Sequence, residues 1–322
     1  MKKYIISILC GLLLFPKISL AYSDYIIPGG ETLGIDIKSN GVMVIGFYKI
    51  NGKYNKGDLK VGDYITKING QNTEDLETLT RKIEEAVSSK KVNITFKRNN
   101  KEHTTTIELI YDNNTYKTGL YVKDNITGIG TLTYVDPNTK IYGALGHEII
   151  ESSSNSIVEI KTGTIFENKI TSINKSANGA PGSKNAKFYF DNVYGDIKKN
   201  TKYGIYGNYS TTLPNKELLK VAENKDIKVG EAYIYTVLED QSVEKFTINI
   251  NSINEDSYIK NLIFTITDER LISKTGGIVQ GMSGSPIMQE DKIIGAVTHV
   301  MIDDVSSGYG IFITTMLKEG ES

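Results

Sequence analysis

Short apolar segments recur from about residue 118 to the end of the chain, and turns rich in Gly, Asn and Asp separate them. They include Gly128–Val135, Phe246–Ile250 and Leu262–Ile266, and helical periodicity between them is weak. Regular spacing of this kind is typical of an all-β sandwich or barrel. Residues 118–322 are also numerous enough for a double barrel with a core of its own. We therefore expect a mainly β protein.

A mixed pattern with a small α+β character occupies residues 25–111. Gly62–Gly70 reads as a strand that enters a tight Asn-Gly turn. Thr73–Val87 has apolar residues at helical spacing after a Thr cap, with acidic residues in its first turn. Val92–Phe96 alternates like a half-buried strand. We expect one compact unit here, followed by a polar linker at Asp112–Thr115.

This unit resembles a bacterial PDZ domain. The specific part is Lys60–Gly70, whose Gly-Asp and Asn-Gly pairs and apolar spacing match the family pattern. Leu33, Gly34 and Ile35 resemble its carboxylate-binding loop. The resemblance implies that an extended peptide adds a strand to a sheet edge while backbone N–H groups hold its terminal carboxylate. The alternative is a PDZ fold whose groove is closed or unused.

The N-terminus predicts export. Lys2 and Lys3 precede the apolar run Ile5–Phe15, and Ser19–Ala21 offers a small-residue cleavage site. This order is typical of a secretory signal, and the run is short for a spanning helix, which needs roughly 20 apolar residues. Residues 1–21 are thus expected to be a signal peptide, with an uncleaved membrane anchor as the alternative.

Composition excludes several classes of function. Cys10 is the single cysteine and lies in the signal segment, so the mature chain would have no disulfide, no cysteine nucleophile and no thiolate metal ligand. The formal net charge is -1, which does not indicate a nucleic-acid partner.

The run Gly281-Met282-Ser283-Gly284-Ser285-Pro286 has the composition of a nucleophile loop. Glycines beside Ser283 allow a tight turn and close approach of a substrate. The N–H groups of Gly281 and Ser283 are the expected oxyanion donors of a barrel-type serine protease. The alternative is a plain Gly/Ser turn between strands.

A serine nucleophile needs a base, and the chain has only three histidines. His103 lies in a Thr-rich strand of the PDZ-like unit. His147 follows Gly143–Gly146, a run of small residues, at an expected strand end, and this favours it over His299. Either could instead be a satisfied core histidine. Zinc is disfavoured because no pair of histidines has ligand spacing.

The base should be oriented by a carboxylate. Asp268 ends an alternating apolar strand and lies between His147 and Ser283 in chain order, as in chymotrypsin-like barrels. Spacing leaves other candidates open, namely Asp136, Asp191 and Asp240. Any of the four could be a solvated turn residue.

Taken together, the sequence resembles the family of stage IV sporulation protein B, the SpoIVB-type serine endopeptidases of endospore-forming bacteria. The specific segments are Gly143–His147, Thr275–Ile287 and the stretch from Gly295 to Gly310. The resemblance implies a trypsin-like double β-barrel in residues 118–322 and a triad of His147, Asp268 and Ser283. It implies no metal or organic cofactor.

The resemblance also implies a biological role. Family members are secreted from the forespore into the space between the two spore membranes, sometimes tethered there. They cleave themselves and a membrane-associated regulator, which leads to activation of a late mother-cell sigma factor. Their PDZ domain is thought to recognise the enzyme itself and its target. Alternatives are a non-catalytic exported scaffold and a general quality-control protease of the envelope.

Two segments depart from the family pattern. Glu148–Glu151 follows the predicted base, where an Asp is expected near the end of the run, and Ser183 replaces a usual Glu. Neither touches the predicted triad, and both bear on substrate choice and loop conformation.

Overall fold

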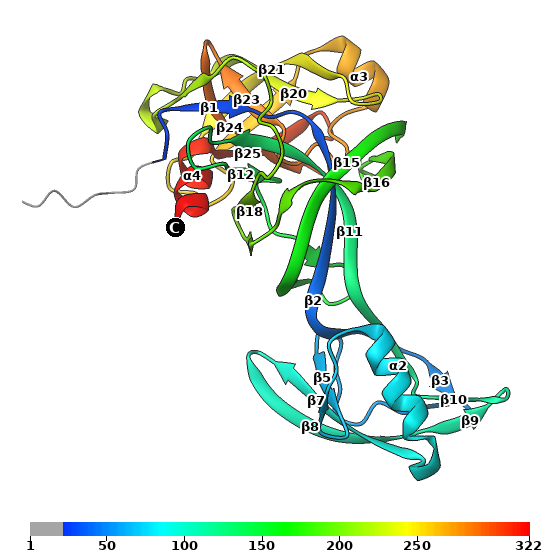
Figure 1. The fold of residues 1–322 in the computed structure, drawn as a ribbon. Helices are drawn as coiled ribbons and strands as arrows, with labels where there is room; N and C mark the ends of the chain where they lie inside the picture. Colours follow the sequence, from blue (N-terminus) through cyan, green and yellow to red (C-terminus); the bar gives the residue numbers. More distant parts are fainter. Residues whose placement is uncertain (1–21) are drawn as a thin grey trace, which may run out of the picture.

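The structure is a computed structural model that describes residues 22–322. The predicted signal segment, including Lys2, Lys3 and Cys10, lies outside the described residues. The described chain is mainly β and forms a large body and a smaller one, joined by the long strands β2 (Thr32–Phe47) and β11 (Leu120–Val135) (Figure 1). Among residues 22–322, no helix is long and apolar enough to cross a membrane.

The smaller body has a PDZ fold. Its sheet runs from the start of β11 through the end of β2 to β5, β7 and β8, and helix α2 lies against it. Its elements besides β2 and β11 are β3 (Lys49–Ile50), β4 (Lys53–Tyr54), β5 (Tyr64–Ile68), β6 (Gln71–Asn72), α2 (Leu76–Glu85), the 3-10 helix η1 (Val87–Ser89), β7 (Lys91–Arg98), β8 (Lys101–Glu108), β9 (Ile110–Asp112) and β10 (Thr115–Lys117).

The predicted turn and strands of this body are confirmed. Asn69 and Gly70 have φ of 50° and 80° and connect β5 to β6, as an Asn-Gly turn requires. The helix begins later than expected. Asp75, and not Thr73, caps α2, because the Asp75 carboxylate accepts a hydrogen bond from the Thr78 N–H at 2.8 Å.

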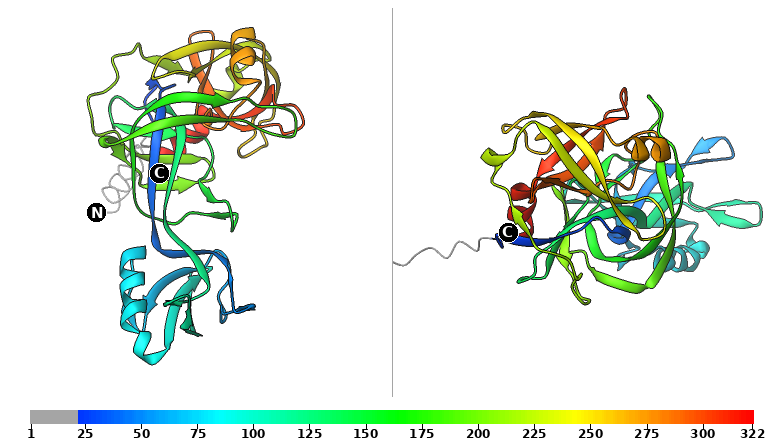
Figure 2. Two further views of the ribbon diagram at one scale, coloured as in Figure 1. Left: turned by 90° about the vertical axis from the view of Figure 1, so that its right-hand side faces the viewer. Right: turned by 90° about the horizontal axis from the view of Figure 1, so that it is seen from above.

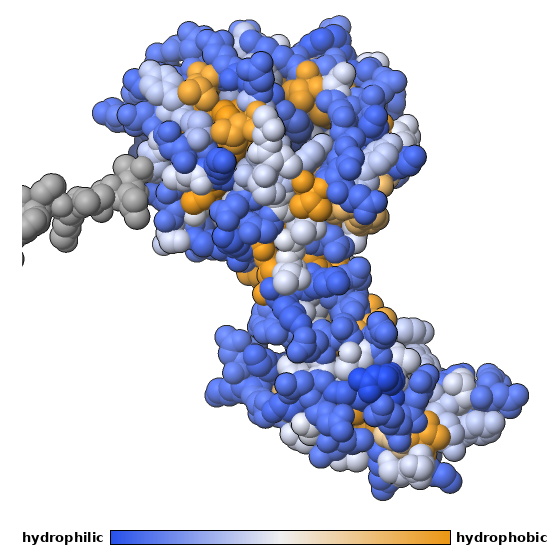
Figure 3. Space-filling view, viewed as in Figure 1, coloured by the Kyte–Doolittle hydropathy of each residue, from blue (hydrophilic) through white to orange (hydrophobic). Residues whose placement is uncertain are grey.

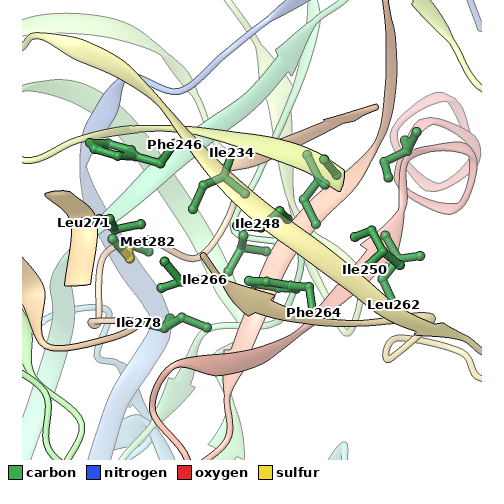
Figure 4. Close-up of a cluster of buried hydrophobic side chains, with 14 of the residues drawn as sticks. Ile234, Phe246, Ile248, Ile250, Leu262, Phe264, Ile266, Leu271, Ile278 and Met282 are labelled. Carbon is green, nitrogen blue, oxygen red and sulfur yellow. The ribbon is translucent and has the colours of Figure 1, made fainter. Parts of the chain in front are cut away.

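The large body contains two barrels. In the second, each strand pairs with the next around a closed ring in the order β20 (Gly230–Val237), β21 (Val243–Ile253), β22 (Leu262–Ile266), β25 (Ser307–Phe312), β24 (Lys292–Val300) and β23 (Pro286–Gln289). Strand β21 illustrates how the sequence fills this barrel. Phe246, Ile248 and Ile250 alternate with less buried residues, and Figure 4 shows their side chains in the barrel core.

The first barrel is built from strands that precede the PDZ body in the sequence and strands that follow it. Pairing runs from the end of β11 to β12 (Ile141–Ala144) and β18 (Gly204–Asn208), and from β11 through β2 to β15 (Ile160–Asn174) and β16 (Ser183–Asp196). A bridge between Gly195 and Tyr209 joins β16 to the end of β18 and closes the ring. The double β-barrel expected from the sequence is therefore present.

Shorter elements complete the large body. They are β1 (Tyr25–Pro28), β13 (Ile150–Glu151), β14 (Ser156–Ile157), β17 (Lys199–Thr201), β19 (Leu219–Val221), the 3-10 helix η2 (Asn224–Asp226), α3 (Glu269–Thr275) and α4 (Ile313–Glu321). Helix α4 packs against β12, β24 and β25, and so contacts both barrels.

The strand pairing corrects the expected domain boundary. Strand β1 pairs with β11 and β19, and the first half of β2 pairs with β15, so residues 25–38 belong to the first barrel and not to a PDZ unit that spans 25–111. The PDZ body is inserted between the halves of the β2–β11 ribbon. Figure 2 shows this ribbon as the connection between the two bodies.

Candidate active site

The predicted nucleophile loop connects α3 to β23 at the junction of the two barrels. It folds into consecutive turns, because the Met282 N–H donates to Val279 O at 3.1 Å and the Ser285 N–H donates to Met282 O at 2.9 Å. The Met282 side chain is fully buried in the core of the second barrel. Burial of Met282 fixes the loop from below and leaves Ser283 at its surface.

Strand β11 holds the loop from the side of the first barrel. The Thr131 hydroxyl donates to Gly281 O at 2.7 Å, and the Thr131 N–H donates to Ser283 O at 3.0 Å. The Thr133 hydroxyl donates to Gly284 O at 2.8 Å. Three carbonyls of the loop are thus bound by two buried threonines.

Gly284 cannot carry a side chain here. Its φ is +93°, and a Cβ atom would lie 2.1 Å from Thr131 O and 2.5 Å from Leu145 N. The glycine predicted to allow a tight turn therefore also allows the two barrels to touch.

The predicted oxyanion donors are unengaged. Gly281 has φ of +97°, and within residues 22–322 neither its N–H nor that of Ser283 donates a hydrogen bond to another residue. A carbonyl oxygen beside Ser283 could take both donors.

Ser283 and His147 line the same cavity, which has a volume of about 490 Å³. Segments of both barrels and the β2–β11 ribbon form its walls. The lining residues are Ile35, Ile126, Gly128, Ile129, Leu145, His147, Glu148, Ile149, Ile150, Pro181, Ile278, Val279, Gln280, Gly281, Ser283, Thr298, His299, Val300 and Ile302. The structure thus brings together the two residues on which the sequence hypothesis depends.

His147 follows two left-handed residues, Leu145 and Gly146, each with φ of 69°, which turn the chain away from β12. Its Nδ1 lies 2.7 Å from the carbonyl oxygen of Glu148. With Nδ1–H donating to that carbonyl, the neutral ring keeps a free lone pair on Nε2. Burial lowers the pKa of His147 and favours this neutral form.

Ser283 does not donate to a histidine in this conformation. Its hydroxyl donates to Thr298 O at 2.9 Å. Reaction would require the hydroxyl to leave this carbonyl and turn toward an imidazole.

The structure does not bring Asp268 to the cavity. Its carboxylate caps α3, accepting from the Arg270 N–H at 3.0 Å, and forms an ion pair with the Arg270 guanidinium at 2.8 Å. These hydrogen bonds lower the pKa of Asp268. Asp136, Asp191 and Asp240 are not among the cavity residues either. The carboxylate in the lining belongs to Glu148, whose Oε2 is buried without a hydrogen-bond partner among the described residues.

His299, the rival base, lies beside His147, with ring centroids 5.0 Å apart. Its Nδ1 is buried and has no hydrogen-bond partner in the described part of the chain. Burial, followed by the nearby His147, lowers the pKa of His299 to about 4. His103 is remote, because it stacks on Phe96 in the PDZ body.

A buried lysine beneath the loop was not anticipated. Lys184 is 4% exposed, and its Nζ donates to the Thr236 hydroxyl at 2.8 Å. Its stem packs against Gly281, where a Cβ would lie 3.1 Å from Lys184 Cδ. Burial lowers its pKa to about 7. Nothing in the alternating sequence of β16 distinguishes this lysine from solvated ones.

The predicted carboxylate-binding loop is wrong in position. Leu33, Gly34 and Ile35 lie within β2, which pairs with β11 on one side and β15 on the other. Their backbone groups face two neighbouring strands, so they cannot receive a peptide carboxylate. In the PDZ body, α2 contacts both β5 and β11, and the Leu76 N–H at its start donates to Asp124 Oδ2 of β11 at 2.8 Å.

No cluster of three or more His, Cys, Asp or Glu side chains within residues 22–322 is arranged to hold a metal ion. The reactive groups at the cavity are a serine hydroxyl, two imidazoles, the Glu148 carboxylate and free backbone N–H groups.

A double β-barrel, a Gly-flanked serine at the barrel junction and an inserted PDZ domain define a serine peptidase. The model of the family described as SpoIVB peptidase S55 matches residues 114–317, and that of the PDZ domain matches residues 32–109. The chain belongs to the SpoIVB peptidase S55 family.

Other comparisons are more distant. A solved structure titled "Crystal structure of Rv3671c protease, inactive form" is 15% identical, covers 60% of this chain and 85% of its own, and aligns with a TM-score of 0.33. No curated protein matches the sequence.

Proposed function

We propose that this peptidase is an exported signalling enzyme of endospore formation that cleaves itself and a membrane-associated regulator. Membership of the SpoIVB peptidase family supports this role, as does the predicted signal segment in residues 1–21. Its proposed place is the space between the two forespore membranes, with or without a membrane tether. Cleavage of the regulator would lead to activation of a late mother-cell sigma factor.

The observation that carries the proposed chemistry is the cavity shared by Ser283 and His147. Ser283 Oγ attacks the scissile carbonyl carbon while His147 Nε2 takes its proton, and the N–H groups of Gly281 and Ser283 hold the oxyanion. The imidazolium then gives the proton to the leaving amine. Water, deprotonated by the same imidazole, hydrolyses the acyl-enzyme.

Entry of substrate would start this sequence. Thr298 O accepts the Ser283 hydroxyl in the free enzyme. A substrate backbone N–H that donates to this carbonyl would compete with the serine, and the released hydroxyl could turn to His147. The free conformation is then a resting state of the nucleophile.

The deciding experiment compares the N-terminal sequences of products from the wild-type chain and from Ser283→Ala. We expect defined internal cleavage in the wild type and none in the variant. His147→Ala should match the Ser283 variant, whereas His299→Ala should retain cleavage. Self-cleavage that persists in folded Ser283→Ala would place the nucleophile elsewhere.

The role of Asp268 needs a separate test, because chain order and the family resemblance suggest it as the third triad member but it does not line the cavity. The variant Asp268→Asn keeps a good helix cap while it removes the charge. Lost turnover at unchanged stability would assign the carboxylate to catalysis and require α3 to move. Unchanged turnover would leave Asp268 as the cap of α3.

A further inference from the structure

Apart from its reactive groups, the cavity has a mostly apolar wall. Aliphatic side chains and one proline make up most of the lining, and isoleucine is the commonest residue in it. None of the described residues that line it is an Asp, Lys or Arg. Such a wall removes apolar surface from water, and it offers no cation to an acidic side chain.

We propose that this cavity binds an aliphatic side chain of the substrate next to the scissile bond, so that the enzyme cuts beside Val, Ile or Leu. The inference rests on the proposed peptidase mechanism at Ser283. It goes beyond that mechanism by naming the class of residue that the site selects.

Two half-buried residues face the cavity from opposite barrels. Ile129 belongs to β11, and a Cβ built on Gly281 would lie 3.3 Å from its Cγ2 atom, so its side chain borders the oxyanion loop. Val300 ends β24, two residues after the Thr298 carbonyl that accepts the Ser283 hydroxyl. A side chain between Ile129 and Val300 would therefore lie within the reach of the nucleophile loop.

Part of the cavity wall also belongs to the hydrophobic core of the second barrel. Ile278 and Val279 lie in the segment that leads into the nucleophile loop, and they are 4% and 2% exposed. Both belong to the core of the second barrel. Figure 3 shows a mostly hydrophilic outer face, from which such an apolar concavity differs. A preformed apolar pocket with few polar groups is the usual form of a specificity site.

Glu148 is the one feature that could favour another substrate. Its buried Oε2 lacks a partner among the described residues, and it could accept a hydrogen bond from a lysine or arginine. Glu148 adjoins His147 along the chain, however, and its neighbours Ile149 and Ile150 continue the aliphatic wall. The experiment below separates a basic from an aliphatic preference.

The test uses the full chain and a fluorophosphonate probe, followed by an equimolar pool of peptides that differ only at the residues beside one bond. Probe labelling that Ser283→Ala abolishes establishes an active serine. We expect kcat/KM for Val, Ile or Leu to exceed that for Lys or Glu by about 100-fold or more. Unlabelled wild-type protein would contradict the proposed function itself, before any specificity is measured.

Two variants then test the wall. Ile129→Lys should remove the aliphatic preference and favour acidic side chains, and the nearly isosteric Val300→Thr should lower kcat/KM for aliphatic peptides about 10-fold with labelling retained. Val229→Lys, at a 62% exposed position outside the cavity, is the matched control. It should change neither the aliphatic preference nor kcat/KM for aliphatic peptides. If Ile129→Lys does not fold, Val300→Thr alone still tests whether the cavity selects an aliphatic side chain.

Three results would overturn the inference while leaving the peptidase intact. In the first, the enzyme is labelled by the probe but either cuts regardless of the flanking residues or cuts none of the aliphatic peptides. Another is unchanged selectivity in Val300→Thr. The third is a preference for Lys or Arg that Glu148→Gln abolishes.

Discussion

His147 and Lys184 show how burial sets the charge of single residues around the site. Each is removed from water, and each loses its proton more readily as a result. For the histidine this favours the neutral base that peptide hydrolysis needs. For the lysine the lowered pKa reflects the cost of burying an ammonium that has no carboxylate partner within residues 22–322, and this cost lowers the stability of the fold.

The first prediction concerns the pH dependence of catalysis. Because burial lowers the pKa of His147 below its usual 6.5, the base stays unprotonated in mildly acidic solution. We expect the acidic limb of kcat/KM to have an apparent pKa below 6.5, measured with an aliphatic peptide between pH 4 and 9. An apparent pKa of 7 or above would argue against a buried neutral base.

Stability must be followed in the same pH range, because His299 also loses its proton on folding. Its pKa is about 4 in the folded state and 6.5 as the ordinary value, so the unfolded chain binds more protons between these values. Folded stability is therefore complete above pH 6.5 and decreases toward pH 4. Circular dichroism separates this loss from the titration of the base.

The second prediction is that Lys184→Met stabilises the protein. The lysine pKa is about 7 when folded and 10.5 ordinarily, so stability of the wild type rises between pH 7 and 10.5 and the full penalty applies below 7. The variant should lack this rise. At pH 7 we expect it to gain on the order of 2 to 4 kcal/mol, after allowance for the Thr236 hydroxyl that loses its partner.

Urea unfolding at pH 6, 7 and 9 measures this gain. Lys187→Met is the matched control, since Lys187 lies on the same strand and is exposed. It should change the free energy of unfolding by no more than about 0.5 kcal/mol at any pH. Destabilisation by Lys184→Met would show that the ammonium makes stronger interactions than the hydrogen bond to Thr236.

Among the elements, β11 has the widest set of roles. It starts in the PDZ body beside α2, lines the cavity at Ile126 and Ile129, and binds the nucleophile loop through Thr131 and Thr133. One strand thus spans the region from the PDZ sheet to the oxyanion donors.

The third prediction tests this connection. In Thr131→Val the side chain keeps its shape but no longer binds Gly281 O, so the oxyanion loop loses a buried support. We expect kcat/KM to fall about 10- to 100-fold, with a loss of roughly 1 to 2 kcal/mol in unfolding free energy.

Thr127→Val is the control on the same strand, where the hydroxyl makes an exposed hydrogen bond to Asp36. It should leave both quantities nearly unchanged. If the two variants behave alike, the Thr131 hydroxyl does not support the loop.

Local patterns predicted the elements that depend on local contacts. The Asn69-Gly70 turn, the strands β5 and β7 and the alternation in β21 could be read from a few neighbouring residues. The segment Leu33–Ile35 could not. It resembles a PDZ loop, but its partners lie near residues 129 and 166, and long-range pairing of this kind leaves no signal in a short motif.

The candidate site shows the same limit. Ser283 and His147, which line the same cavity, could be predicted as candidates because glycines and small residues mark both segments. Asp268 was predicted from its place at a strand end, from chain order and from the family resemblance, none of which shows where its carboxylate points. It serves as a helix cap in the structure because Arg270 and the N-terminus of α3 bind that carboxylate. Lys184 could not be anticipated, because only the packing of two barrels removes it from water.

At the scale of the whole molecule, the PDZ body is an insertion in the peptidase. Its core and the barrel cores are separate clusters, joined through β2 and β11 (Figure 1). The residues before the insertion contribute buried side chains to the first barrel, including Ile27, Leu33 and Ile37. A peptidase body without the PDZ body therefore still needs residues 25–38.

The fourth prediction follows from this connectivity. Lys38 pairs with Asn125 across the β2–β11 ribbon, so an Asn-Gly turn that replaces residues 39–124 would close the ribbon as a two-residue hairpin. We expect this shortened chain to fold with a cooperative thermal transition and to react with the fluorophosphonate probe at Ser283. By contrast, a chain of residues 114–322 lacks β1 and β2, which exposes the first barrel core, and it should neither fold nor react. Cooperative unfolding and probe labelling of residues 114–322 would show that the first barrel does not require the segment before the PDZ insertion.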